Sequence, residues 1–364
     1  MELKDIRNKI NLIDKDMAKL FEERMNLAYE VAQYKIKNGL AIEDKVRENQ
    51  LIKQNVEYIQ NDEIKEYYID FLKDLMNTSK KYQKRLVEGM KIAYCGVEGA
   101  FAHIASKKLF DSQQLESYPS FKDAYQAVVD GKADACLLPI ENSFAGDVGE
   151  VMDLMFSGPL FVNEVIDIEI VHNLIASKNA TLDTIKKVTS HPQALSQCNK
   201  YILEKNFEQI KASNTAIAAY ELSKSNDDTL AVIASKEVAE LYDLKVLESH
   251  INESRNNTTR FAVFSKVLNK RKVINKMGEH FILVFTVLNE AGALAKTLNI
   301  IGAHNFNMRT LRSRPMKELI WNYYFFVEAD GDINSADGQD MIKELSSVCD
   351  RLKVVGTYYS YIEK

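Results

Sequence analysis

Residues 3–37 carry an uninterrupted heptad pattern, and no other feature of the chain constrains its fold as strongly. Neither proline nor glycine occurs in it before Gly39, so the pattern predicts one helix about 50 Å long. A single helix of that length cannot bury its own apolar seam, and it needs two shorter helices, a partner chain, or both. The seam consists of Leu3, Ile10, Met17, Arg24 and Val31 together with Ile6, Ile13, Leu20, Leu27 and Tyr34.

Arg24 lies in the middle of this seam, where Leu or Ile is expected. Lys35, eleven residues later, lies about 20° round the helix from Arg24, so both cations face the same interior side. Burying unpaired cations is costly. Two interpretations stay open: a polar seam residue that sets register, or an anion site inside a helical bundle.

Two further helices supply polar groups that favour the anion site. In the second helix, Asp44, Arg47 and Glu48 share one face at spacings i, i+3 and i+4. The third helix is expected from about 62 to 88, and its apolar stripe ends in Ser79 and Gln83. Cations, an amide and carboxylates that converge in a bundle indicate a small polyanionic ligand.

These motifs resemble the all-helical chorismate mutase family. The residues that carry the resemblance are Ile6-Arg7-Asn8-Lys9-Ile10, Glu23-Arg24, Lys35, Asp44-Lys45-Val46-Arg47-Glu48 and Ser79-x-x-x-Gln83. The resemblance implies a dimer of intertwined three-helix chains that binds chorismate in a site lined by Arg24, Lys35, Asp44, Arg47, Glu48, Ser79 and Gln83, with Arg7 supplied by the partner chain. Arginines would clamp the two substrate carboxylates, and Lys35, Gln83 and Glu48 would carry the catalysis.

From Lys91 the pattern changes to strand, polar turn and helix, repeated. Strands are expected at 92–95, 133–138, 187–189 and 230–233. Ser190 is expected to be an N-cap, with His191 and Pro192 in the first turn of the next helix. Strand ends and helix N-termini together form edges that suit anions.

A polar stretch runs into a strand at 256–264 and places Thr259 next to Arg260. Neighbouring strand residues point to opposite faces, so both side chains cannot line one pocket and one of them can be structural. A hydroxyl at a strand end that faces a cleft can donate a proton. The alternative is a threonine that only caps a turn.

In this order, the motifs of the central region resemble prephenate dehydratase over about residues 91–267. They are Gly96-Val97-Glu98-Gly99-Ala100-Phe101, Pro139-Ile140-Glu141-Asn142-Ser143, Ser190-His191-Pro192-Gln193-Ala194-Leu195 and Asn257-Thr258-Thr259-Arg260-Phe261. The resemblance implies two α/β lobes hinged around a cleft, as in periplasmic binding proteins, with a prephenate site made of Glu141, Asn142, Ser190, Gln193, Thr259 and Arg260. Thr259 would donate a proton to the leaving hydroxyl, with Glu141 polarising it or acting through water. The first loop departs from the family, because Val97, Ala100 and Ala102 stand where Pro, Ser/Thr and Ser are common.

After a lysine-rich linker at 266–279, the expected order is strand, helix, strand, strand, helix, strand, which is a ferredoxin-like α+β unit. Gly292-Ala293-Leu294 and Ser313-Arg314-Pro315 resemble an ACT domain that binds phenylalanine, and the resemblance places the effector at a dimer interface formed by Gly292, Ala293, Leu294, Ser313 and Arg314. The family has Glu before Ser-Arg-Pro, whereas this chain has Arg312. If Arg312 faces the ligand it should weaken feedback, and if it faces solvent it should matter little. The alternative is a dimerisation module without a ligand.

Composition narrows the remaining classes. A net charge of −5 argues against nucleic acid as the main partner, and no apolar run is long enough to cross a membrane. The four cysteines are far apart and indicate a reducing cytoplasm, and the six histidines show no metal-ligand spacing, so neither metal nor cofactor is expected.

We therefore predict a multidomain cytoplasmic enzyme with domains at 1–88, 89–268 and 276–364: an intertwined all-α bundle, a two-lobed α/β domain and a ferredoxin-like α+β domain. It is expected to act on chorismate and prephenate, to respond to phenylalanine and to form a homodimer or higher homo-oligomer. Two alternatives stay open: an arogenate-preferring dehydratase, and a ligand-binding regulatory protein with degenerate catalysis.

Overall fold

The computed structural model describes residues 2–225, 227–254, 256–268, 278–316 and 322–359, so most of the lysine-rich linker lies outside the described residues. The chain forms two compact units, residues 1–90 and 91–364. Within the described ranges, no helix is both long enough and apolar enough to span a membrane.

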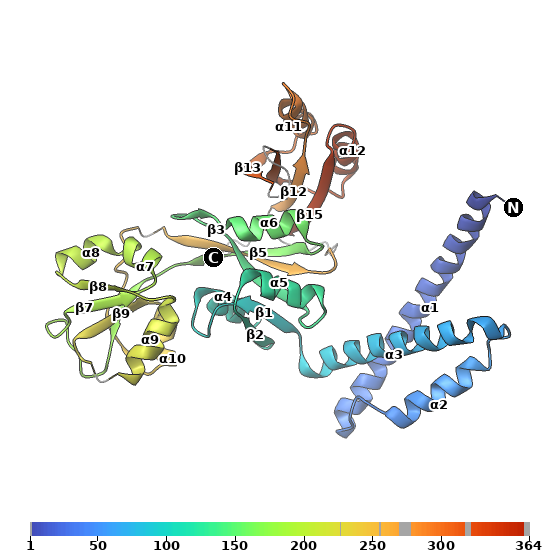
Figure 1. Ribbon diagram of the computed structural model, residues 1–364, viewed down its shortest axis with the longest axis horizontal. Helices are drawn as coiled ribbons and strands as arrows, with labels where there is room; N and C mark the ends of the chain where they lie inside the picture. Colours follow the sequence, from blue (N-terminus) through green and yellow to red (C-terminus); the bar gives the residue numbers. More distant parts are fainter. Residues whose placement is uncertain (1, 226, 255, 269–277, 317–321, 360–364) are drawn as a thin grey trace. The chain divides into compact units, whose positions relative to one another are not determined.

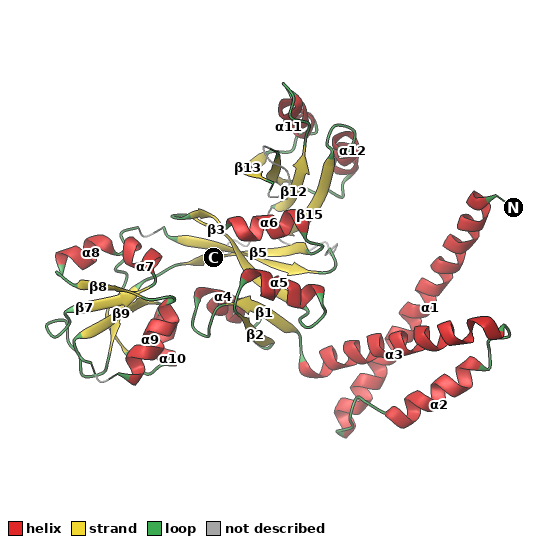
Figure 2. Cartoon of the chain, viewed as in Figure 1, coloured by secondary structure: helices red, strands yellow, loops and turns green. Residues whose placement is uncertain are grey.

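The first unit is entirely helical, with α1, α2 and α3 labelled in Figure 1 and its helices drawn red in Figure 2. Helix α1 is a single helix, as the heptad pattern predicts. It ends where Gly39 takes a left-handed conformation with φ 63°, which glycine adopts at little cost. The elements are α1 (Leu3–Asn38), α2 (Lys45–Val56), the 3₁₀ turn η1 (Asp62–Ile64) and α3 (Lys65–Glu88).

Most of the apolar seam of α1 is exposed in the single chain. Leu3 is 61% exposed and Leu20 and Tyr34 are both 64% exposed, whereas only Ala28 and Ala32 of the helix are buried. Helix α3 packs across α1 and buries Leu72, Met76, Ser79 and Gln83. The short contact between these helices leaves a long apolar face of α1 uncovered.

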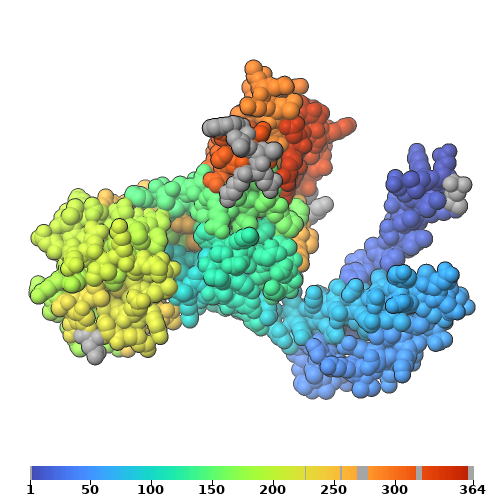
Figure 3. All heavy atoms as spheres, viewed as in Figure 1, coloured from blue at the N-terminus to red at the C-terminus, as the bar shows by residue number. Residues whose placement is uncertain are grey.

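The second unit begins with two α/β lobes, which Figure 3 shows as separate rounded masses, the second in yellow-green. The first lobe contains β1 (Lys91–Cys95), α4 (Phe101–Leu109), β2 (Gln114–Tyr118), α5 (Phe121–Val129), β3 (Ala135–Asn142), β4 (Gly146–Asp147), α6 (Gly149–Ser157), β5 (Phe161–Glu169) and, returning much later, β11 (Thr258–Ser265). The second lobe contains β6 (Asn173–Ala176), β7 (Lys187–Ser190), α7 (Pro192–Gln197), α8 (Asn199–Glu204), β8 (Glu208–Lys211), α9 (Thr215–Lys224), β9 (Leu230–Ala234), α10 (Lys236–Leu241) and β10 (Lys245–Glu248).

The chain crosses between the lobes twice, after β5 and before β11. The two crossing segments are hydrogen-bonded: Ile170 N–H donates to the Asn257 carbonyl at 2.7 Å, and Ile251 N–H donates to the His172 carbonyl at 3.0 Å. Paired crossing segments of this kind form the hinge of a two-lobed binding fold. The strands around them order as β5-β11-β3-β1-β2 in the first lobe and β10-β6-β9-β7-β8 in the second.

The C-terminal domain has the predicted ferredoxin-like order. Its elements are β12 (Glu279–Thr286), α11 (Ala293–Ala303), β13 (Met308–Pro315), β14 (Tyr323–Asp330), α12 (Ala336–Leu345) and β15 (Arg351–Tyr359). Helix α12 ends at Leu345. The hydroxyls of Ser346 and Ser347 donate to the carbonyls of Ile342 and Glu344, which competes with the continuing helix.

The C-terminal sheet is continuous with the sheet of the first lobe. Its order β13-β14-β12-β15 runs on to β5, so one ten-stranded sheet spans both domains. The junction is the parallel pairing of Gly356 with Val162. A Cβ at Gly356 would overlap the Val162 carbonyl, so this close approach needs glycine.

Candidate active sites

In the helical unit, Arg24 of α1 meets Ser79 of α3 through a hydrogen bond from Nη1 to Oγ. Burial lowers the pKa of the Arg24 guanidinium. Gln83 lies one turn beyond Ser79, is 8% exposed, and its Oε1 has no hydrogen-bond partner among the described residues. A buried amide oxygen without a partner among the described residues, on the same helix as the serine that holds a half-buried cation, is a polar site that suits a ligand.

Three other predicted residues of this unit, Lys35, Asp44 and Glu48, have partners within the helical unit itself. Lys35 donates from Nζ to the Ile42 carbonyl at 2.6 Å, and Asp44 caps α2 by accepting the Arg47 N–H at 2.9 Å. Glu48 pairs with Lys80 at 2.9 Å. The single chain therefore brings together Arg24, Ser79 and Gln83, while Arg7 lies exposed on α1.

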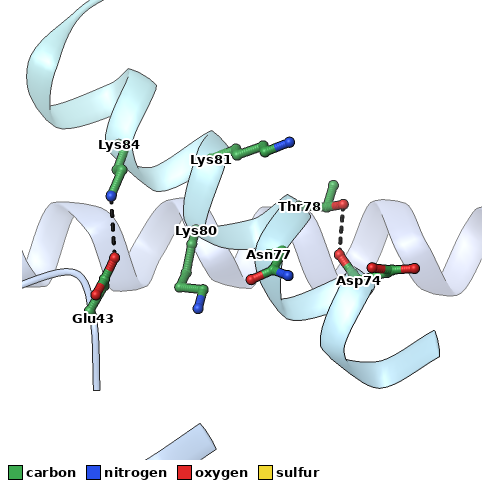
Figure 4. Close-up of a pocket in the computed structure, with 7 residues that line it drawn as sticks. All are labelled: Glu43, Asp74, Asn77, Thr78, Lys80, Lys81 and Lys84. Carbon is green, nitrogen blue, oxygen red and sulfur yellow. Dashed lines mark hydrogen bonds and ion pairs between the residues drawn. The ribbon is translucent and has the colours of Figure 1, made fainter. Parts of the chain in front are cut away.

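Lys80 is a residue that the sequence reading missed, although it stands between Ser79 and Gln83. It also lines a surface groove of about 390 Å³, shown in Figure 4. The groove is formed by Glu43, Asp74, Asn77, Thr78, Lys80, Lys81 and Lys84, and Lys84 pairs with Glu43 at 3.3 Å. None of the eight residues predicted for the helical site lines this groove, so the groove is separate from that site. Lys80 connects the two, because it lines the groove and pairs with Glu48.

In the α/β unit, the Thr259 hydroxyl lies next to the Asn142 amide, with Asn142 Nδ2 and Thr259 Oγ1 2.9 Å apart. Asn142 Oδ1 accepts the backbone N–H groups of Phe144 at 3.0 Å and Ala145 at 2.8 Å. Because a backbone N–H can only donate, these bonds fix which side of the amide faces Thr259. The amide therefore donates to Thr259, and the threonine's own hydrogen is left to be donated elsewhere.

A buried polar chain continues from Asn142 into the hinge and the second lobe. Asn142 Nδ2 donates to Asn257 Oδ1, and Asn257 Nδ2 donates to Gln197 Oε1, both at 2.9 Å. His172 Nε2 lies 2.7 Å from the same Gln197 oxygen. Since that oxygen only accepts, Nε2 carries the proton, and the buried Nδ1 has no partner among the described residues. Burial lowers the pKa of His172, so the ring is neutral near pH 7.

Gln197, Asn257 and His172 were not predicted as site residues from the sequence, whereas Gln193 was. Gln193 is exposed at the start of α7, whereas Gln197 is 4% exposed one turn later. The spacing of four residues on one helix is the signal that makes Gln197 an equal candidate.

Glu141 lies on the opposite face of the sheet from Thr259. Residues 141 and 142 alternate along β3, so Asn142 meets Thr259 while Glu141 pairs with Arg260 at 3.4 Å and with Arg312 at 2.5 Å. The structure corrects the expectation that Glu141 polarises Thr259, because strand alternation separates them.

The Ser190 segment also differs from its prediction. The N-cap of α7 is His191, whose Nδ1 accepts the Gln193 N–H at 3.2 Å, because Pro192 occupies the first helical position. Ser190 is fully buried and its hydroxyl donates to the Ile233 carbonyl at 2.6 Å.

The first loop of the α/β unit joins the two lobes by packing. Gly99 has φ 86°, and a Cβ there would lie 3.0 Å from Val238 of the second lobe. Val97 packs against the core of that lobe, and Ala100 and Ala102 are buried. The apolar residues at the three positions where the family commonly has Pro, Ser/Thr and Ser therefore serve lobe contact and helix packing.

Comparison with known proteins places this geometry in a family. Residues 92–268 match the prephenate dehydratase model, and residues 6–84 match the chorismate mutase type II model. The bifunctional chorismate mutase/prephenate dehydratase of Buchnera aphidicola is 30% identical over 97% of this chain and 95% of its own length. The chain belongs to the bifunctional chorismate mutase/prephenate dehydratase family. It is an enzyme with both activities, in phenylalanine biosynthesis.

Two solved structures share the fold of the dehydratase and C-terminal domains. Prephenate dehydratase from Arthrobacter aurescens, solved in complex with L-Phe, has a TM-score of 0.69 at 24% identity and covers 74% of this chain and 90% of its own. A protein described as GqqA, a novel type of quorum quenching acylases, has a TM-score of 0.68 at 26% identity, with 74% and 98% covered. The same fold thus carries different described activities, and the assignment to mutase and dehydratase rests on the sequence family.

The residues predicted to bind phenylalanine fall into two groups, one at the start of α11 and one on β13. Gly292 is the N-cap of α11 with φ 85°, followed by Ala293 and Leu294, and Ser313 is exposed on the edge strand β13. Arg314 alternates to the other face and pairs with Asp153 of α6 at 3.1 Å.

Arg312 shares that face, and its Nε lies 2.8 Å from Asp147. Neither arginine faces free solvent, because both contact the first lobe of the dehydratase domain.

Proposed function

We propose that the mutase domain rearranges chorismate in a site shared between two copies of the chain. The exposed seam of α1 supports this dimer, because a second α1 would cover the apolar face that one chain leaves open. Arg24 and Arg47 bind the two carboxylates of the substrate, and Lys35, Gln83 and Glu48 surround the breaking ether bond, with Asp44 and Ser79 beside them. The partner subunit's Arg7 completes the cluster of cations. The rearrangement is intramolecular and needs a compact conformer and positive charge rather than a nucleophile.

In the dehydratase domain, Thr259 donates its proton to the ring hydroxyl of prephenate as that group leaves. The C–O bond breaks, water departs, and the electron pair of the bond to the lost carboxylate enters the ring as CO₂ leaves. Thr259 recovers its proton from solvent. The observation that carries this proposal is the direction of the hydrogen bond from Asn142 to Thr259. Because Thr259 Oγ accepts this bond, its own hydrogen is free to be donated to the substrate. The same bond stabilises the negative charge that develops on Oγ when the proton leaves.

Other residues of the dehydratase site support this step. The sequence resemblance places Ser190 and Gln193 at the substrate, and the buried chain adds Gln197, which links Asn142 to the second lobe through Asn257. Glu141 and Arg260 act from the opposite face, by holding the strands that carry Asn142 and Thr259.

The C-terminal domain binds phenylalanine at an interface between two copies and regulates the dehydratase. Support comes from the exposed edge strand β13, the open N-terminus of α11 at Gly292, and the L-Phe complex of a protein with this fold. The functional domains are 1–88, 89–268 and 276–364, in a homodimer or higher homo-oligomer. Four cysteines without disulfides are in keeping with a cytoplasmic location.

A coupled assay on the purified chain tests this function: chorismate is supplied, and phenylpyruvate is measured with and without phenylalanine. Thr259→Ala is expected to lower kcat for added prephenate with little change in KM, and Thr259→Ser to keep much of the rate. Wild-type rates in both variants would reject the donor role. Arogenate in place of prephenate, in the same assay, measures which substrate the dehydratase prefers.

A further inference from the structure

Arg260 connects the strand that carries Thr259 to the C-terminal domain. On β11, Thr259 stands opposite Asn142 and Arg260 stands opposite Glu141, so their side chains leave the strand on different faces. The strand pairing shifts register between Arg260 and Phe261, and irregularities of this kind re-aim side chains beside active sites. Because the two residues share a peptide unit, a displacement of Arg260 is transmitted directly to Thr259.

The closest partners of the Arg260 guanidinium belong to the C-terminal domain. Its two terminal nitrogens reach Glu328 of β14 at 3.0 and 3.1 Å, and Nη2 donates to the Tyr358 hydroxyl of β15 at 2.7 Å. Glu328 is 1% exposed and Tyr358 is 2% exposed, and the Tyr358 hydroxyl also donates to Glu328 at 2.5 Å. A two-point contact with a buried carboxylate fixes both the position and the orientation of a guanidinium.

The partners that the first lobe supplies are weaker. Glu141 lies 3.4 Å from Arg260, and Asp167 lies 3.6 Å away with 67% of its side chain exposed. Burial raises the pKa of Glu328, but the hydrogen bonds and charge of Arg260 outweigh it, so the net pKa is lowered and the carboxylate is ionised near pH 7. The C-terminal domain therefore provides the main counter-charge of an arginine that belongs to the dehydratase strand.

Two more arginines reach the lobe from the other side of this junction. Arg312 of β13 pairs with Glu141, which is itself a partner of Arg260, and Arg314 pairs with Asp153 of α6. Together with the strand pairing of β15 and β5, these contacts determine where the C-terminal domain docks on the first lobe.

We infer that Glu328 is a positioning residue for the dehydratase reaction: it holds Arg260 and, through the shared strand, the position of Thr259. This inference rests on the proposed role of Thr259 as proton donor. A small misplacement of a reacting group lowers the rate of the chemical step strongly and affects substrate binding less.

The test compares Glu328→Gln, Glu328→Asp and Tyr358→Phe in the full-length chain. The matched control is Asp330→Asn, a carboxylate two residues further along β14 whose partners His280, Arg309 and Asn307 all belong to the C-terminal domain. For each variant, kcat and KM are measured with added prephenate. The mutase rate of the same sample and its thermal unfolding report on folding.

Glu328→Gln is expected to lower the dehydratase kcat about tenfold or more, with KM within about threefold and the mutase rate unchanged. Glu328→Asp should recover part of the loss because it restores the charge. Tyr358→Phe should lower kcat about threefold, since it removes one hydroxyl and keeps the ion pair. Asp330→Asn should stay near the wild-type kcat.

A folded Glu328→Gln chain with wild-type kcat would overturn the inference, and so would a loss no larger than that of Asp330→Asn. If Glu328→Gln does not fold, Tyr358→Phe decides, and an unchanged kcat there rejects the inference. A rate that depends on Thr259 but not on Glu328 rejects this inference alone. A wild-type rate in Thr259→Ala rejects the donor role and the inference together.

Discussion

In the helical unit, α1 exposes most of its apolar seam, and Arg24 of that seam donates a hydrogen bond to Ser79 of α3. In the α/β unit, Asn142, Asn257, Gln197 and His172 are all buried and joined in one continuous hydrogen-bonded chain. The first unit has little interior of its own, because the buried residues of its three helices are only Ala28, Ala32, Leu72, Met76, Ser79 and Gln83 among those the structure describes. The second unit has two lobes with separate cores, and the polar residues between them are enclosed by a single chain. Under the proposed function, the mutase site therefore needs a second copy of the chain, whereas the dehydratase site does not.

The largest effect is expected at Lys35. Lys35→Ala removes the cation proposed for the ether oxygen, and the mutase rate should fall by about two powers of ten or more. Dehydration of added prephenate should not change, because the dehydratase site lies in the other unit. The two rates are measured on one sample. An unchanged mutase rate would remove Lys35 from the site.

The dehydratase counterpart is Asn142→Asp. A carboxylate can only accept, so it would draw the Thr259 hydrogen inward, away from the substrate. The expected result is a drop in kcat of about a hundredfold with a smaller change in KM. Retention of the wild-type kcat in this variant would show that the direction of the Asn142–Thr259 bond is irrelevant.

Subunit mixing tests the comparison directly. An Arg7→Ala chain mixed with a Lys35→Ala chain forms hybrids in which one of two mutase sites is intact, so random pairing should restore about a quarter of the mutase activity. A Thr259→Ala chain mixed with an Asn142→Asp chain should restore none of the dehydratase activity, because both residues lie in one chain. Mutase complementation that is absent in verified hybrids, or dehydratase complementation that is present, would break the comparison.

A smaller effect concerns acid stability of the α/β unit. Burial lowers the pKa of His172 below its unfolded value of about 6.5, so the unfolded chain binds the proton more readily than the folded one. The stabilising contribution of the neutral ring is present above about pH 6.5 and is lost as pH falls through the lower folded pKa. His172→Gln should flatten the decline of the unfolding temperature of this unit between about pH 6.5 and 5. A variant with the same slope as the wild type would rule out His172 as its source.

The smallest effect is expected at Arg312. Its guanidinium points to Glu141 and Asp147 rather than to the start of α11, and all three side chains are partly exposed. Arg312→Gln should change the concentration of phenylalanine needed for half-inhibition by less than about threefold, since such ion pairs contribute about 1 kcal/mol or less. This concentration is measured by titrating phenylalanine against the dehydratase rate. A tenfold shift would show that Arg312 does act at the phenylalanine site.

The order of elements could be predicted from the sequence because it depends on local periodicity. The heptads of α1, the alternation of strands and helices after Lys91, and the ferredoxin-like order at the C-terminus were all predicted and confirmed. The opposite faces of Thr259 and Arg260 follow from strand alternation alone, and the structure has them so. The resemblance to the family also predicted Asn142 and Thr259 as site residues, and the structure places them in contact.

What only the tertiary structure decided is which partners the polar side chains have. Nothing near residue 141 in the sequence indicates that Glu141 faces Arg312, 171 residues later, or that Arg260 finds its carboxylate in Glu328 of another domain. The same holds for Gln197, which lies one helical turn from Gln193 but is buried, whereas Gln193 is exposed. Periodicity records the face on which a side chain lies, whereas its partner depends on which distant strand is brought against that face. In this chain, the sheet that continues from the dehydratase lobe into the C-terminal domain brings Glu328 to Arg260 and Arg312 to Glu141.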